Sequence, residues 1–194
     1  MANNYTQASF TILCSQEQAQ MALDAIAYVT DTDVAEGEHL LSKPVSECSL
    51  TELLVLGIIQ NHPECDPFEP TFGQSESPED NYELELKAEI TGKGLAICHD
   101  ESINLDHAIA VTTAVLSVFN LPEMVTINAA FVCDRPRENE FGGATIVVTK
   151  DTHHYEEGFN FSRLMNEAHD AGRNGFHLIL GDNDRREQIL VPRG

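Results

Sequence analysis

The densest group of reactive residue types is the loop CDRPRENEFGG, which runs from Cys133 to Gly143. It carries Arg135 and Arg137, two of only seven arginines in the chain, next to a cysteine thiol. Because each guanidinium presents a fork of N–H donors, such a pair could bind an anionic ligand. The plainer hypothesis is a rigid structural loop, in which Pro136 fixes one turn and neighbouring charges pair with each other. Cys133, Arg135 and Arg137 are therefore candidate ligand-binding residues.

A second reactive group is Cys98 and His99, with two acidic residues directly after them. A thiol beside an imidazole could act as a nucleophile with its base, and the set could also ligate a metal. However, the chain contains no complete zinc-ligand pattern, no phosphate-binding loop and no Gly-x-Ser-x-Gly motif. We therefore predict no catalytic residue, no metal and no cofactor. Cys98 and His99 stay candidates, with the two arginines, for a ligand pocket between the two halves of the chain.

Charge is the most informative overall feature, because 32 Asp and Glu against 11 Lys and Arg give a formal net charge of -21. Such a surface repels nucleic acid and anionic lipid, and it attracts basic protein surfaces. Plain solubility, or adaptation to a salty cytoplasm, is the alternative explanation. Six carboxylates fall within one run of fourteen residues: Glu76, Glu79, Asp80, Glu83, Glu85 and Glu89.

The acidic run continues into the segment from Tyr82 to Ile90, in which apolar and charged residues alternate. Strict alternation predicts a half-buried strand. Its glutamates then share one solvent face, with about 7 Å between successive side chains. A row of carboxylates on a rigid strand could occupy a basic groove that normally binds nucleic-acid phosphates.

Two capping pairs, Ser15 with Gln18 and Ser49 with Glu52, predict the starts of two helices. The second helix should end before His62, and its apolar residues cover more than one face. We therefore expect it to lie between other elements or in an oligomer contact.

Further elements follow from hydrophobic periodicity. An apolar stripe predicts a helix from Leu105 to Phe119, and another helix is expected at about 162–172. The polar stretches 31–47 and 151–158 should be irregular connections. Short apolar runs predict strands at 9–14, 94–98, 125–133, 143–149 and 176–180.

An internal duplication is indicated by two equal spacings. Phe72 and Tyr82 are ten residues apart, as are Phe131 and Phe141, and each pair encloses a charged loop that contains proline. We predict an α+β fold of two related strand-helix-hairpin units, with helices packed on an antiparallel or mixed sheet. The predicted parts are a first unit at 1–92 with an inserted helix at about 32–62, a second unit at 93–151, a C-terminal helix and strand at 152–189, and LVPRG at 190–194, which matches a thrombin-site tag remnant.

The loop Cys-Asp-Arg-Pro-Arg, followed by Phe-Gly-Gly and a strand of Val and Thr, resembles a pattern in short, acidic, uncharacterised proteins of bacterial and mobile-element genomes. The resemblance covers residues 95–150 and implies the fold of that unit. It brings no established activity and no site residue.

We expect a cytoplasmic, non-enzymatic protein that binds a basic protein surface, with no direct nucleic-acid or membrane partner. In its sharper form, the hypothesis is a nucleic-acid mimic that occupies a nucleic-acid-binding protein. The five cysteines lack a disulfide spacing, and no segment resembles a signal peptide or a membrane span, which fits this compartment. The alternatives are a small-molecule enzyme or ligand-binding domain with a pocket between the two units, and an oligomeric scaffold, for which a homo-oligomer is expected.

Overall fold

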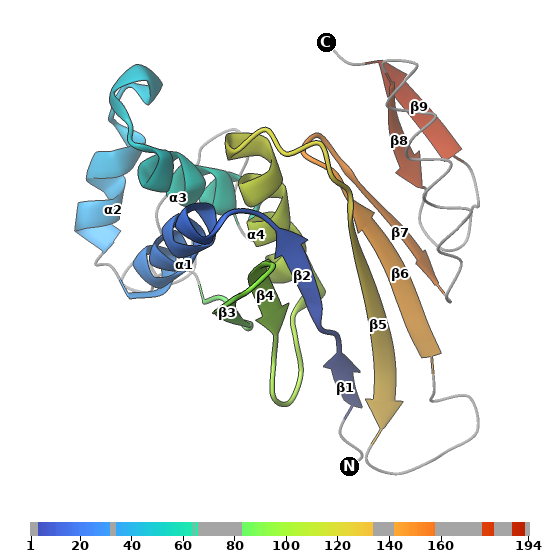
Figure 1. Ribbon diagram of the computed structural model, residues 1–194. Coiled ribbons are helices and arrows are strands. Elements are labelled where there is room, and N and C mark those ends of the chain that lie inside the picture. The colour runs from blue at the N-terminus through green and yellow to red at the C-terminus, as the bar shows by residue number, and fades with distance from the viewer. Residues whose placement is uncertain are drawn as a thin grey trace.

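The structure is a computed structural model with an α+β fold, in which helices and antiparallel sheets mix along the chain (Figure 1). The predicted fold class is therefore confirmed. The residues that the structure describes are 4–31, 34–63, 65, 83–133, 142–157, 176–180 and 188–192. The helices are α1 (Gln16–Asp31), α2 (Val34–Leu41), the 3-10 turn η1 (Val45–Glu47), α3 (Leu50–Asn61) and α4 (Leu105–Val118). The strands are β1 (Asn4–Gln7), β2 (Phe10–Leu13), β3 (Lys87–Thr91), β4 (Gly94–Cys98), β5 (Val125–Cys133), β6 (Gly142–Val148), β7 (His153–Glu157), β8 (Phe176–Leu180) and β9 (Gln188–Pro192).

The first two strands of the chain, β1 and β2, belong to two different sheets. One sheet has the order β2-β4-β3, and the other has the order β1-β5-β6-β7. All of these strands pair antiparallel, and β1 and β2 follow each other directly in the sequence. A single stretch of chain therefore forms an edge of both sheets. The strands β8 and β9 form a separate antiparallel pair.

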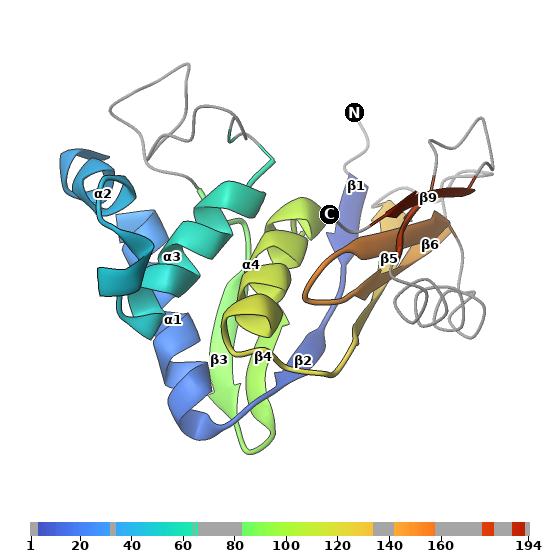
Figure 2. The ribbon, with the colours of Figure 1, turned by 90° about the horizontal axis from the view of Figure 1, so that it is seen from above.

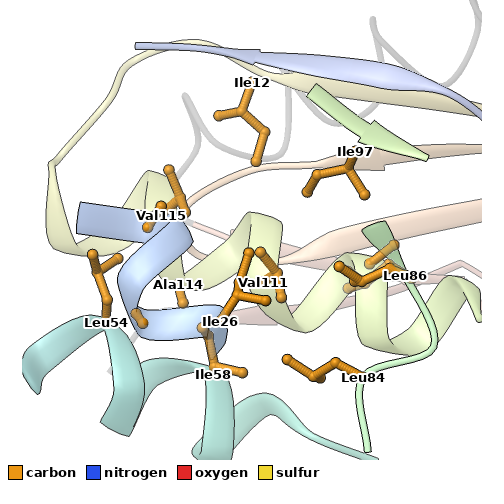
Figure 3. Close-up of a cluster of buried hydrophobic side chains, with 14 of the residues drawn as sticks. Ile12, Ile26, Leu54, Ile58, Leu84, Leu86, Ile97, Val111, Ala114 and Val115 are labelled. Atoms are coloured by element: carbon orange, nitrogen blue, oxygen red, sulfur yellow. The ribbon is translucent and has the colours of Figure 1, made fainter. Parts of the chain in front are cut away.

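The helix α4 lies at the centre of the fold, between α3 and the four-stranded sheet (Figure 2). The six consecutive residues 107–112 are all buried. Because successive helical residues are about 100° apart, six of them cover every side of the helix. Figure 3 shows Val111, Ala114 and Val115 of α4 directed toward side chains from α1, α3, β2 and β4. The core is therefore organised around this helix.

The helices α3 and α4 approach closely because both have small residues at their contact. A Cβ atom added at Gly57 would lie 3.1 Å from the Cβ of Ala114. The helix α3 also packs against α1 and α2, and its apolar side chains Leu54, Val55 and Ile58 are buried within the chain. Of the two explanations for its apolar faces, packing between other elements is the one that the structure shows.

Both predicted capping pairs are present. At α1, the N–H of Ser15 donates to Oε1 of Gln18 at 2.9 Å, and the N–H of Gln18 donates to Oγ of Ser15 at 3.2 Å. At α3, the pair Ser49 and Glu52 forms the same reciprocal box. Nζ of Lys43 also donates to Oε1 of Glu52 at 2.7 Å, which ties the chain before η1 to the start of α3.

Two polar stretches that we expected to be irregular instead contain regular elements. In 31–47, the segment Val34–Leu41 is the helix α2, and its Leu40 is only 5% exposed. In 151–158, the segment His153–Glu157 is the strand β7, which pairs with β6 along its length. Composition was misleading here because one buried side chain, or a backbone ladder, can stabilise a polar segment.

Strands of the two predicted units pair with each other. The strands β1 and β2 of residues 1–92 pair with β5 and β4 of residues 93–151, and the β3–β4 turn crosses the boundary between the units. The internal duplication is not shown and stays a prediction. Its residues Phe72, Tyr82 and Phe141, and the predicted helix at 162–172, lie outside the described residues. The predicted strand 176–180 is β8, and β9 includes the first three residues of the predicted tag remnant.

Replacing Gly94 with alanine should loosen the pairing of β4 with β2. Gly94 has a φ of +139°, and a Cβ there would lie 2.2 Å from the carbonyl oxygen of Ile12. We expect Gly94→Ala to lower the free energy of unfolding by about 1 to 3 kcal/mol, measured by urea denaturation. Gly92→Ala in the same turn is the control, because no atom lies within 4 Å of its added Cβ. Equal losses in the two variants would contradict the prediction.

The ion pair between Lys43 and Glu52 should make the free energy of unfolding depend on pH. The hydrogen bond from Lys43, and then those from Ser49, lower the pKa of Glu52 from 4.5 to about 2. A carboxylate with a lowered folded pKa contributes stability above its unfolded pKa, and this contribution is lost as the pH falls through the folded value. The urea midpoint of Glu52→Gln should therefore lie below that of the wild type at pH 7, and the difference should shrink toward pH 3. Glu123→Gln, at an exposed glutamate before β5, is the control. A difference for Glu52→Gln that is constant with pH would refute this account.

Candidate acidic interface

The acidic segment keeps its predicted alternation. Leu84 and Leu86 are only 7% and 9% exposed, whereas the glutamates beside them are exposed. Regular pairing with β4 begins only at Lys87, so residues 83–86 are held by other contacts. One side of the segment is therefore apolar and buried, and the other side is acidic and exposed.

The structure brings a second group of carboxylates beside this segment. The loop between β4 and α4 returns to it, with Asp100 ion-paired to Lys87 and Asn104 hydrogen-bonded to Glu85. The ion pair lowers the pKa of Asp100 and raises that of Lys87. We call the combined surface the acidic edge, and its exposed carboxylates are Glu83, Glu85, Glu89, Asp100, Glu101 and Asp106.

Sequence reasoning identified only the first half of the acidic edge. The carboxylates of 100–106 join it because β3 and β4 form a hairpin, with Lys87 opposite Cys98. The turn Gly92-Lys93-Gly94 between the alternating strand and the apolar strand after it was the signal from which this neighbourhood could have been predicted.

Asn104 connects the two halves of the acidic edge. Its Oδ1 accepts hydrogen bonds from the N–H of Asp106 at 3.0 Å and of His107 at 3.3 Å, which caps α4. Its backbone N–H donates to the carbonyl oxygen of Glu85 at 3.1 Å, and its Nδ2 donates to Oε2 of Glu85 at 3.2 Å. One residue therefore fixes both the start of α4 and the position of Glu85.

Two buried histidines contact the backbone of the acidic edge. His62 at the end of α3 and His107 in α4 are 3% and 6% exposed, and their stacked rings have centroids 4.6 Å apart. Nδ1 of His107 accepts the N–H of Glu85 at 3.1 Å, and Nε2 of His62 lies 3.4 Å from the carbonyl oxygen of Glu83. The pairing of these rings had no signal in the sequence, because they lie 45 positions apart on different helices.

The predicted ligand-binding residues are spread over different parts of the fold. Cys98 is half-buried at the end of β4, and Cys133 is buried at the end of β5, in the other sheet. Nδ1 of His99 accepts two backbone N–H groups of the turn that follows it, both at 3.1 Å. Candidates that lie outside the described residues are Glu76, Glu79, Asp80, Arg135 and Arg137.

Metal ligands, cysteines and long apolar helices are the other features that could indicate a function. Within the described ranges, no group of three His, Cys, Asp or Glu residues could hold a metal ion. All five cysteines are free thiols, and burial raises the pKa of Cys14, which disfavours its reactive thiolate form. No helix in the described part of the chain is long and apolar enough to cross a membrane.

Removing the Asn104 side chain should destabilise the protein through the lost helix cap. We expect Asn104→Ala to lower the free energy of unfolding by about 1 to 2 kcal/mol in urea denaturation. Asn104→Ser keeps an oxygen that can cap α4, so it should recover most of the loss. If the serine variant were as unstable as the alanine variant, the cap would not be the source of the effect.

Comparison with known proteins gives no relative for this chain. No family model matches it, and neither a curated protein nor a solved structure matches it. The function must therefore be inferred from the acidic edge itself.

Proposed function

We propose that this protein is a non-enzymatic binding protein whose acidic edge docks against a basic surface of a partner protein. The observation that carries the proposal is the composition of the edge. The edge carries six exposed carboxylates and one lysine, Lys87, and that lysine already forms an ion pair with Asp100. The edge therefore presents a negative potential that attracts lysine and arginine side chains.

The backbone of the edge is well fixed, which favours binding. Antiparallel pairing with β4 holds β3, and Asn104 holds the chain at Glu85. Groups that are already in place lose less conformational freedom when a partner binds. A fixed backbone therefore favours binding by a surface whose carboxylates must match the positions of charges on a partner.

The class of partner can be inferred from the weakness of a single exposed ion pair. One exposed ion pair contributes only about 0 to 1 kcal/mol, so useful affinity needs several at once. A groove that binds nucleic-acid phosphates has many lysines and arginines in a row. We therefore propose a cytoplasmic nucleic-acid-binding protein as the partner, with the acidic edge occupying the place of the phosphates.

Neutralising part of the edge should weaken this binding. The variant combines Glu83→Gln, Glu89→Gln and Glu101→Gln, because no described residue donates a hydrogen bond to these three carboxylates. We expect the triple variant to retain about tenfold less basic protein from lysate than the wild type, since three contacts of the above size are lost. Retention should fall between low and moderate salt, and added nucleic acid should displace the retained protein.

The matched control removes the same number of charges elsewhere, with Asp31→Asn, Glu47→Gln and Glu123→Gln at exposed positions outside the edge. It should bind like the wild type. Equal losses in both triple variants would mean that total charge, and not the edge, determines binding. If the wild type retains no basic protein at either salt concentration, or if nucleic acid does not compete, the proposal fails.

A further inference from the structure

We propose that the stacked rings of His62 and His107 form a pH-sensitive latch for the acidic edge. At neutral pH the latch holds the segment that carries Glu83 and Glu85, and uptake of a proton releases it. This inference rests on the proposed function, because the latch would regulate the same surface.

The first argument is the direction of one hydrogen bond. The N–H of Glu85 can only donate, so Nδ1 of His107, 3.1 Å away, must accept. The neutral ring therefore carries its proton on Nε2, and a second proton must go to Nδ1. That proton would turn the acceptor into a donor that faces another donor, so the bond to Glu85 cannot survive protonation.

The second argument is burial. Both rings are almost completely buried, and their centroids lie only 4.6 Å apart. A charge on either ring is costly there, because water is excluded and the other ring is adjacent. A released segment would expose the rings to water, where they can take up the proton. Falling pH therefore favours the released arrangement, which binds more protons, in the range where imidazoles ordinarily titrate.

The neighbouring charges modify this balance but do not replace the lost bond. Carboxylates attract an imidazolium, yet those of the acidic edge are exposed and are screened by water and salt. Asp106 also interacts with His153 on β7. Titratable and charged residues that contact the pair, or adjoin it in the chain, include Cys65, Glu83, Glu85 and Asp106, and His153 interacts with Asp106.

Hydrogen exchange of the Glu85 amide tests the latch in the isolated protein. We expect its protection factor to fall at least about tenfold between pH 7.5 and pH 5.5, while amides of β5 keep theirs. In His107→Asn, an amide oxygen takes the place of Nδ1 and cannot be protonated, so the protection of Glu85 should not change with pH. A pH-independent wild type, or a variant that loses as much protection as the wild type, would overturn the latch.

The wild type alone also provides a decisive measurement, which is useful if His107→Asn does not fold. The pH at which the His107 ring titrates in NMR spectra should coincide with the pH at which Glu85 loses protection. Titration of the ring without loss of protection at Glu85 would refute the proposal.

A binding measurement separates the latch from the proposed function. The probe is a fluorescent ten-residue lysine peptide, measured at pH 7.5 and pH 5.5 at one ionic strength. We expect the wild type to bind it several-fold more weakly at pH 5.5 and His107→Asn to bind it equally at both values. Absence of binding at both values would contradict the proposed function, while the exchange result would still decide the latch. Equal wild-type binding at both values would show that the latch does not regulate the edge.

Discussion

The burial of α4 on all sides is the constraint on which the rest of the structure depends. A helix with buried residues all the way from 107 to 112 cannot face water anywhere along that turn. The fold meets this demand with α3 on one side and the four-stranded sheet on another, as Figure 2 shows. The close approach of α3 depends on Gly57 and Ala114, since even a Cβ added at Gly57 would lie only 3.1 Å from the Cβ of Ala114.

The same helix also determines where the acidic edge lies. Its N-terminus needs acceptors for free N–H groups, and Asn104 supplies one for Asp106 and His107. Because Asn104 also binds Glu85, a movement of the acidic segment would also disturb the helix cap. The position of a surface charge is thus coupled to the packing of the core. His107 adds a second connection, since it belongs to α4 and accepts the amide of Glu85.

Local features of the fold could be predicted from the sequence, and long-range ones could not. The caps at Ser15 and Ser49 and the apolar run of β5 depend on residues a few positions apart, and they were identified correctly. The strands β1 and β7 were missed because their stability comes from pairing with β5 and β6, which leaves no apolar pattern in their own residues. The same difference between local and long-range features holds for the acidic edge.

For the site, alternation identified the outward glutamates of residues 83–89, which is a local property. Joining them to Asp100 and Asp106 requires the β3–β4 hairpin, and stacking His62 on His107 requires the contact of α3 with α4. The first contact could have been predicted from the turn Gly92-Lys93-Gly94. The second could not be derived from spacing, because His62 and His107 lie on distant segments that meet only after the core has formed. The sequence therefore indicated that this surface is acidic, but not how far the surface extends or which residues hold it in place.

The residues that hold the acidic segment in place, Asn104 and His107, also bear on the role of this segment. A lysine or arginine beside Glu85 would hold this carboxylate more strongly, since bonds to charged donors are stronger than neutral ones. It would also cancel the negative charge. Here the carboxylate and backbone of Glu85 are instead bound by the neutral amide of Asn104 and the neutral ring of His107. Neutral anchors fix the position of the segment and leave its potential intact, which is the combination that a charge-based binding surface requires.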